Sequence, residues 1–356
     1  MVSVPPASAQ PKVSVLVPTF NYGRYLRQTL DSILAQDFAD FELIISDDAS
    51  QDDSAEILRE YAARDPRIHA YAHRENLGMV QNWNWCLRHA RGEYVKFMFG
   101  DDCFTRSDAL SQMVAALDRA PQAALVASAR LLIDEHSRVV STWDDFRAAG
   151  HHHGISVIRR CLHEDRNLVG EPSTVLFRRD QAARGFDPNF RQIVDEEFWL
   201  HLLLRGDFVY LTEPLCAFRQ HGAQQTRVNQ GSFIGPLESL LLLTRYIDCI
   251  SNPAWGGCTP FQRRRILYRR LHYSRKRVPR SARILVAEAM VHAHLRQPWY
   301  AVMWTHHRVT GPFHRLRTFL VRTFGPGARA LPSVQPVAPV FTAPAPRVRP
   351  VFAAAS

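Results

Sequence analysis

Short apolar runs alternate with amphipathic segments over the first hundred residues of the chain. The continuous apolar runs lie at 13–18, 41–46, 68–73 and 94–99. Such runs are typical of strands that are buried on both faces, as in a parallel sheet. In the segments between them, at 26–34, 54–64 and 79–89, apolar side chains recur at helical spacing. Strands that alternate with helices predict βαβ units and an α/β domain with a mostly parallel central sheet.

The pattern is less regular beyond residue 105. We expect helices at 108–119 and near 197–205, and strands at 123–129, 173–177 and 208–211. We therefore divide the chain into a flexible N-terminus (1–11), an α/β domain (12–234), a basic helical region (235–324) and a tail (325–356). The tail is rich in Pro, Ala and Val and has no acidic residue, which predicts disorder.

Composition indicates a globular protein, with 46% hydrophobic and 22% charged residues. No apolar run approaches the roughly 20 residues that a membrane-spanning helix needs. The N-terminus lacks the basic start and apolar core of a signal peptide. Six cysteines are scattered without C-x-x-C spacing, which favours reduced thiols over disulfides or a zinc site. These features predict a cytoplasmic protein.

Charge is distributed unevenly along the chain, although the net charge is +10. Residues 235–356 contain 19 Lys and Arg against three acidic residues, whereas the rest of the chain has a net charge of −6. A basic tail half can bind anionic lipid headgroups or nucleic acid, or be simply solvated. We expect no specific nucleic-acid partner, because the tail has no known recognition motif and the acidic front half would repel a polyanion.

Two pairs of aspartates follow predicted strands. Asp47 and Asp48 end the second strand, and Asp101 and Asp102 follow the fourth. The carboxyl ends of parallel strands form the crevice in which open α/β sheets bind ligands. Neighbouring carboxylates repel each other unless a cation or hydrogen-bond donors compensate them. The pairs therefore indicate a site for a divalent metal, a ribose hydroxyl or a base edge, with a turn or a helix cap as the alternative.

A series of motifs then resembles the family 2 glycosyltransferases. The matching segments are Val13–Asn21, Ser32–Gln36, Phe41–Ser50, Glu75–Gly78, Asn82–Asn84 and Ala90–Val95, followed by Asp101–Asp102. The resemblance covers about residues 12–226 and keeps the family's order and spacing. It implies a GT-A fold, a UDP- or dTDP-linked sugar donor, a divalent metal and inversion at the anomeric carbon. It also implies a nucleotide-binding half at 12–105 and an acceptor-binding half at 106–234.

The resemblance implies where the nucleotide sugar binds. Four residues after the first strand would cradle the base: Pro18, Thr19, Phe20 and Asn21. Asp48 would accept a hydrogen bond from the base edge, because an ionised carboxylate is a pure acceptor that matches an imide N–H. Asp47 would then only shape the turn. By the same analogy Asn84 faces the nucleotide or diphosphate and Asp101 lies near the ribose, whereas Trp83 is expected to pack in the core.

The same analogy assigns Mg²⁺ or Mn²⁺ to Asp102, with His221 as a second ligand or a hydrogen-bond donor to the diphosphate. Hard oxygen ligands suit either cation. Phe99 stands where the family often has an earlier acidic residue, so we expect the metal to be held partly through water and phosphate oxygens. Arg219 would pair with the diphosphate.

On the acceptor side, residues 194–202 resemble the family's E-D-x-x-x-W motif, with Val194 where Glu is usual. The match makes Asp195 the general base that takes the proton of the acceptor hydroxyl. Glu196 is the next candidate, and Glu171 is expected to border the acceptor site. Adjacent acids also suit the first turn of a helix, where they interact favourably with the helix dipole.

Together these features predict an inverting glycosyltransferase of polysaccharide or cell-envelope glycan synthesis. Its acceptor would be a hydroxyl of a glycan or a lipid-linked saccharide, and its basic region would contact the inner face of an anionic membrane. One alternative is a catalytically weak nucleotide-sugar-binding protein of the same fold. The other is a nucleic-acid-binding protein that uses the Arg-rich tail.

Overall fold

A computed structural model of the chain describes residues 10–222, 224, 234–247, 249 and 259–277. The chain divides into two compact units, 1–294 and 295–356, and every described residue belongs to the first. The predicted disordered tail and the expected helices beyond residue 277 lie outside the described residues. No helix in the described part of the chain is long and apolar enough to cross a membrane.

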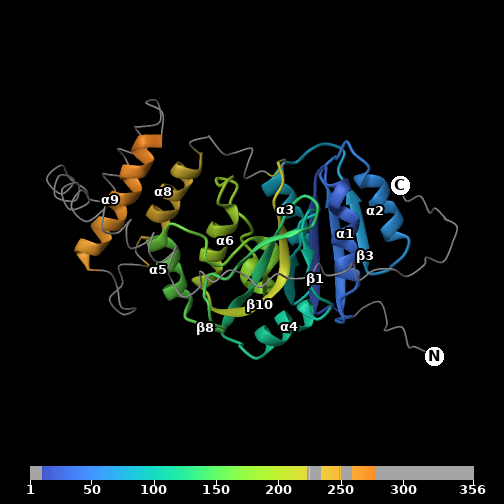
Figure 1. The fold of residues 1–356 in the computed structure, drawn as a ribbon, viewed down its shortest axis with the longest axis horizontal. Coiled ribbons are helices and arrows are strands. Elements are labelled where there is room, and N and C mark those ends of the chain that lie inside the picture. The colour runs from blue at the N-terminus through green and yellow to red at the C-terminus, as the bar shows by residue number, and fades with distance from the viewer. Residues whose placement is uncertain (1–9, 223, 225–233, 248, 250–258, 278–356) are drawn as a thin grey trace. The chain divides into compact units, whose positions relative to one another are not determined.

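Within the described part of the chain, a sheet of ten strands forms the centre of the fold (Figure 1). The strands are β1 (Val13–Thr19), β2 (Phe41–Asp47), β3 (Ile68–Ala72), β4 (Tyr94–Phe97), β5 (Cys103–Phe104), β6 (Ala123–Ile133), β7 (Val139–Trp143), β8 (Gly150–His152), β9 (Val175–Arg178) and β10 (Asp207–Arg219). Their order is β3-β2-β1-β4-β9-β6-β10-β5, with β7 on β6 and β8 on β10. The order reverses between β1 and β4, which creates a crevice at their carboxyl ends.

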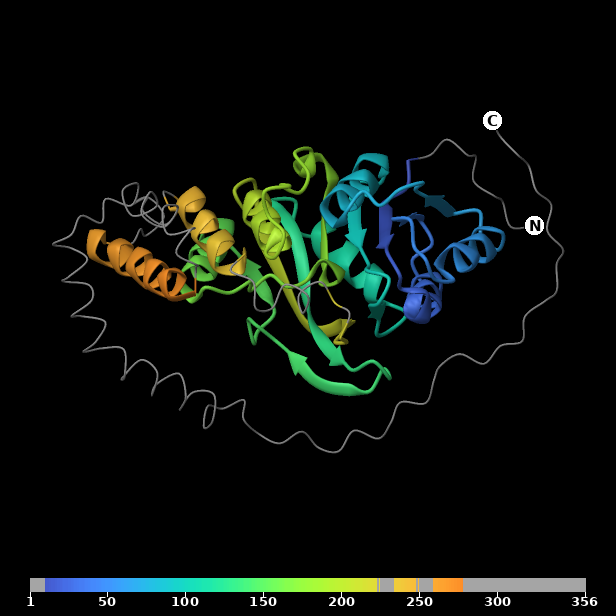
Figure 2. The same ribbon diagram turned by 90° about the horizontal axis from the view of Figure 1, so that it is seen from above.

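The α/β prediction is confirmed, but only the first half of the sheet is parallel throughout. Strands β3, β2, β1 and β4 pair in parallel. Beyond them β9 is antiparallel to both neighbours, and β6 with β10 forms the remaining parallel pair. These two long strands run side by side through the second half of the sheet (Figure 2).

Helices cover both faces of the sheet. They are α1 (Gly23–Leu34), α2 (Ser54–Ala62), α3 (Met79–His89), α4 (Ala109–Asp118), α5 (Gly154–Glu164), α6 (Val194–Leu203), α8 (Ile234–Tyr246) and α9 (Pro260–Arg277). Alternate side chains of β1 point to opposite faces. Val13, Val15 and Val17 pack with α1, α2 and α4, whereas α3 lies on the other face, where Asn82 bonds to Ser46 of β2.

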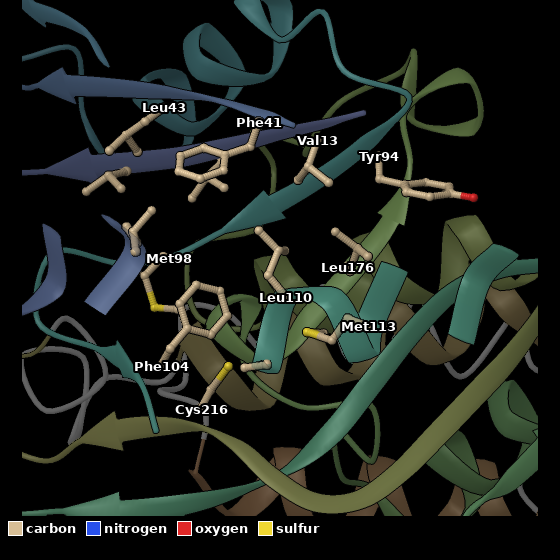
Figure 3. Packing of buried hydrophobic residues seen from close by; sticks show 14 of the residues in the cluster. Val13, Phe41, Leu43, Tyr94, Met98, Phe104, Leu110, Met113, Leu176 and Cys216 are labelled. Carbon is tan, nitrogen blue, oxygen red and sulfur yellow. The ribbon is translucent and has the colours of Figure 1, made fainter. Parts of the chain in front are cut away.

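The main core lies between the sheet and helices α1, α2 and α4 (Figure 3). Phe104, Leu110 and Met113 meet Met98 and Leu176 there, all 6% exposed or less. Burial of one such side chain contributes about 1.5–3 kcal/mol. This core holds the ends of β1, β2 and β4 in fixed positions, from which the loops of the site project.

Helices α8 and α9 belong to the same compact unit as the sheet, although the sequence predicted a boundary at residue 234. Glu197 of α6 is fully buried and forms ion pairs with Arg184 and with Arg245 of α8. Arg270 of α9 pairs with Asp165 at 2.5 Å. An ionised carboxylate without exposure is stable only when it is paired in this way. The basic region therefore begins as part of the folded domain.

Candidate active site

A cavity of about 540 Å³ lies at the carboxyl ends of β1, β2 and β4. Its sheet end is lined by Pro18, Thr19, Phe20, Asn21, Tyr22, Asp48, Asn76, Gly78, Met79, Asn82 and Asp101. Its α6 end is lined by Glu171, Pro172, Arg191, Gln192, Val194 and Asp195. Phe218 and Gln224 also line it, and Trp83 and Phe99 form an aromatic wall with ring centroids 4.8 Å apart. Most of the sequence-predicted site residues thus meet in one cavity.

The loop after β1 forms one wall of the sheet end. Its Asn21 has a φ of 56° and accepts a hydrogen bond from the N–H of Gln51 at 2.8 Å. The hydroxyl of Thr19 is buried and has no hydrogen-bond partner among the described residues. Phe20 is 43% exposed, so its ring is free to meet a planar ligand. A polar group without a partner beside an exposed ring suits a heterocyclic ligand.

Asp48 anchors the opposite loop of the sheet end. Its two oxygens accept the backbone N–H groups of Leu77 at 2.6 Å and Gly78 at 3.0 Å. Gly78 has a φ of 85°, which favours glycine. Each carboxylate oxygen can accept a further bond, so Asp48 still has capacity for a ligand. Asp47 instead bonds to the hydroxyl and N–H of Ser50, which closes the turn after β2.

The second aspartate pair is arranged differently from the sequence-based assignment. Asp101 lines the cavity, and its Oδ2 lies 3.0 Å from Nε2 of His221. Asp102 is fully buried and does not line the cavity; its Oδ1 accepts the N–H of Arg219 at 2.9 Å. Its Oδ2 is buried and has no hydrogen-bond partner among the described residues. Burial and the charge of Asp101 raise the pKa of Asp102 well above its usual range.

Two residues that the sequence predicts to bind the diphosphate form hydrogen bonds within the protein instead. The guanidinium of Arg219 is buried and donates to the Asp101 carbonyl and to Gln28 Oε1, at 2.8 and 2.7 Å. Asn84 forms two hydrogen bonds with the backbone of Phe186, at 2.8 and 2.9 Å. Neither residue lines the cavity. Both hold loops together, whereas Asn82 and Trp83 of α3 do line the cavity.

Asp195 is in the first turn of α6 and faces the cavity. Its Oδ2 accepts a hydrogen bond from Asn167 at 3.0 Å. Burial raises the pKa of Asp195 to about 7, because the ionised form loses its hydration. A carboxylate with this pKa can both hold and release a proton near neutral pH.

The loop before the α6 end is built around Gly170. Its φ is 115°, and its carbonyl accepts hydrogen bonds from Trp199 Nε1 at 2.9 Å and from Asn167 at 3.0 Å. The next residue, Glu171, lines the cavity and pairs with the buried Arg130 at 2.5 Å. Trp199, one turn along α6 from Asp195, thus fixes the same loop that orients Asp195.

Glu196, the second candidate for the base, is buried away from the cavity. Burial raises its pKa to about 8, while the charge of Arg270 in α9 opposes this shift. Adjacent residues of a helix point about 100° apart, and Glu196 is not among the lining residues, whereas Val194 and Asp195 are. Glu196 therefore belongs to the contact between α6 and the C-terminal helices.

Three residues that the sequence did not indicate also build the site. Asn167 holds Asp195, Arg191 lines the α6 end, and Glu238 of α8 holds the loop before α6. Glu238 is one of only three acidic residues in residues 235–356, and this rarity is the feature of the sequence that could have indicated it. The contacts themselves join segments up to 47 residues apart.

Comparisons with known proteins identify the family of the chain. The model of the family described as "Glycosyl transferase family 2" matches residues 14–162. An uncharacterized protein of Mycobacterium tuberculosis is 32% identical over 64% of this chain and 72% of its own. The "putative teichuronic acid biosynthesis glycosyltransferase TuaG" of Bacillus subtilis is 30% identical over 59% of this chain and 79% of its own.

A solved structure supports the fold. The crystal structure of S. aureus TarS 1–349 in complex with UDP-GlcNAc aligns with a TM-score of 0.59, over 78% of this chain and 79% of the TarS 1–349 chain. At 19% sequence identity this likeness shows the fold alone. With the family match and the two relatives, it establishes that the chain belongs to glycosyl transferase family 2 and is a glycosyltransferase of the GT-A fold.

Proposed function

We propose that the protein is an inverting glycosyltransferase that moves a sugar from a UDP- or dTDP-linked donor to a hydroxyl of a glycan or a lipid-linked saccharide. The observation that carries the proposal is that Asp48, Asp101 and Asp195 line one cavity from three distant parts of the chain. The first two would bind the donor, and the third would activate the acceptor.

The nucleotide would occupy the sheet end. Asp48 would accept a hydrogen bond from the imide N–H of uracil or thymine, and its own bonds to Leu77 and Gly78 keep its oxygens in place. The exposed ring of Phe20 and the unpaired hydroxyl of Thr19 would contact the base and ribose. Support comes from the chemistry of these groups and from TarS, which binds UDP-GlcNAc.

A divalent cation, Mg²⁺ or Mn²⁺, would sit beside Asp101, with His221 as the next candidate ligand. The described residues contain no group of three or more His, Cys, Asp or Glu side chains arranged to hold a metal. One or two protein ligands nevertheless suit Mg²⁺, which is commonly bound through a carboxylate, water and substrate phosphates. When bound, the cation would neutralise charge on the departing diphosphate.

Asp195 would be the general base. Its carboxylate takes the proton of the acceptor hydroxyl while that oxygen attacks C1 of the donor sugar from the face opposite the diphosphate. The C1–O bond breaks, and its electron pair leaves with the nucleoside diphosphate, so the anomeric configuration inverts. The pKa of about 7 leaves a substantial fraction of Asp195 ionised at neutral pH.

The proposed acceptor and the proposed place of the protein in the cell depend on a relative and on the charge of helix α9. TuaG is named for teichuronic acid biosynthesis, which supports a role in polysaccharide or cell-envelope glycan synthesis. Helix α9 has eight Lys and Arg and no acidic residue. A helix of this composition favours an anionic membrane surface, which would bring a lipid-linked acceptor to a peripheral enzyme on the cytoplasmic side.

The test is a thermal-shift screen of nucleotide sugars with and without Mn²⁺, followed by measurement of nucleoside diphosphate release. A bound donor raises the melting temperature by mass action. We expect the largest rise with a UDP- or dTDP-linked sugar, and release that requires a divalent cation. Binding without any release would favour the alternative, a nucleotide-sugar-binding protein of the same fold.

A further inference from the structure

The charges that line the cavity are unbalanced. Four lining residues are acidic, namely Asp48, Asp101, Glu171 and Asp195, and Arg191 is the single cation among the described lining residues. The side chain of Arg191 is exposed, and no ion pair of its guanidinium occurs within the described part of the chain. In contrast, Arg130 behind the same cavity is buried and paired with both Asp145 and Glu171. Arg191 is therefore available to an anionic ligand.

Arg191 stands on a loop that the protein holds firmly. The carboxylate of Glu238 accepts the backbone N–H groups of Arg191, Gln192 and Ile193, at 2.6, 2.8 and 3.0 Å. Glu238 itself is only 6% exposed. Three charge-assisted bonds to consecutive N–H groups fix the backbone of the loop. A fixed backbone reduces the entropy that Arg191 loses when it binds a ligand.

The neighbouring side chain supplies the complementary group. Gln192 also lines the cavity, and its Oε1 is buried without a hydrogen-bond partner among the described residues. A buried acceptor without a partner costs free energy unless a ligand or water satisfies it. Arg191 and Gln192 thus present a cationic donor beside an unsatisfied acceptor. A saccharide that carries an acidic group next to a hydroxyl has the matching pair of groups.

We propose that Arg191 binds an oxyanion, a carboxylate or a phosphate, on the acceptor saccharide, and that Gln192 accepts a hydrogen bond from a hydroxyl of the same sugar. The inference rests on the proposed function, because it takes Asp195 as the base. Arg191 precedes Asp195 by four residues at the α6 end. The attacking hydroxyl reaches Asp195 on the side opposite the diphosphate, so a cation at this end meets the acceptor.

The test compares two sugars that differ only at C6. p-Nitrophenyl β-glucuronide carries a carboxylate where p-nitrophenyl β-glucoside carries a hydroxymethyl group, and glucose 6-phosphate against glucose gives the phosphate arm. Dissociation constants are measured by ligand-observed NMR on the full chain with saturating UDP and Mn²⁺. We expect the wild type to bind an acidic sugar about tenfold more tightly than its neutral partner.

Two variants and a control test whether Arg191 is responsible for the preference for the acidic sugar. Arg191→Gln should abolish the preference for the acidic sugar and leave the UDP affinity unchanged. Arg191→Lys should keep part of the preference, because it retains the charge but loses the planar fork. Arg88→Gln removes the same charge from an exposed position of α3 that does not line the cavity, and should change neither value.

Three outcomes would overturn the inference: no preference in the wild type, a preference that persists in Arg191→Gln, or a tenfold loss of UDP affinity in that variant. The last would assign Arg191 to the donor diphosphate. Absence of UDP binding by the wild type would instead overturn the proposed donor site. A preference that Arg191→Gln removes would support the anion site even then.

Discussion

Asn167 donates its side-chain amide to Asp195 Oδ2 at 3.0 Å, and the same nitrogen lies 3.0 Å from the carbonyl of Gly170. The Oδ1 of Asn167 accepts the N–H groups of Val169 and Gly170. Asn167 thus ties the proposed base to the loop that borders the α6 end. A hydrogen bond to the ionised carboxylate favours that form, so it opposes the effect of burial on the pKa of Asp195.

We therefore expect Asn167→Ala to raise the pKa of Asp195 further. The base acts only when it is ionised, so turnover falls as the pH drops through its pKa. The acidic limb of kcat against pH, near 7 in the wild type, should move up by as much as about one unit. Asn189→Ala is the control, because Asn189 bonds to Asp187 outside the cavity. An unshifted limb with reduced stability would make Asn167 purely structural.

Asp195→Asn should lower kcat by at least about 10²-fold, the usual contribution of a general base. The UDP affinity should be unchanged, since Asp195 lies at the α6 end. Glu196→Gln is the matched control at the adjacent position, and loss of turnover in that variant alone would give the role of base to Glu196.

Asp195→Asn should also raise the stability of the fold at alkaline pH. The pKa of Asp195 is about 7 in the folded protein, against a usual value of 3.8. Between these two values the folded state binds more protons than the unfolded state, so this group lowers stability as the pH rises. Asparagine stays neutral. The melting temperature of Asp195→Asn should exceed that of the wild type at pH 8, and the difference should vanish near pH 4.

Strands β1, β2 and β4 could be predicted from the sequence because each is an apolar run buried on both faces, and β3 because it is a short run between two helical segments, although at the sheet edge it is only partly buried. Strands β5 and β8 could not, because they are only two and three residues long, and β7 could not because most of it is exposed; all three depend on pairing with β6 or β10. The motifs indicate Asp48 and Asp195, and both line the cavity. Asn84, by contrast, bonds to Phe186, 102 residues away, and no local pattern contains such a pairing.

The roles of the second aspartate pair depend on which carboxylate faces the cavity. Asp101 lines it, whereas Asp102 is buried against the N–H of Arg219. Asp101→Asn should weaken Mn²⁺-dependent donor binding by about tenfold or more, because a charge-assisted interaction is lost. Asp102→Asn should retain the Mn²⁺ dependence, since Asp102 is fully buried and does not line the cavity. Both variants are measured by UDP titration with and without Mn²⁺. Loss of the Mn²⁺ dependence in Asp102→Asn but not in Asp101→Asn would make Asp102 the metal ligand.

Glu238 connects the C-terminal region to the α6 end, so its loss should affect the acceptor and not the donor. Glu238→Gln retains one acceptor oxygen for three N–H groups and presents its own NH₂ to the others. We expect a destabilisation of about 1–3 kcal/mol, a higher KM for the acceptor and an unchanged UDP affinity.

Glu213→Gln provides the comparison for this last variant, because Glu213 is 62% exposed and 3.7 Å from Arg106. An exposed pair at this distance contributes little to stability, so that variant should melt like the wild type. If Glu238→Gln lowered the melting temperature without changing the acceptor KM, α8 would support the fold only. A rise in KM that exceeds the change with Glu213→Gln would show that α8 positions Arg191 and Gln192 for the acceptor.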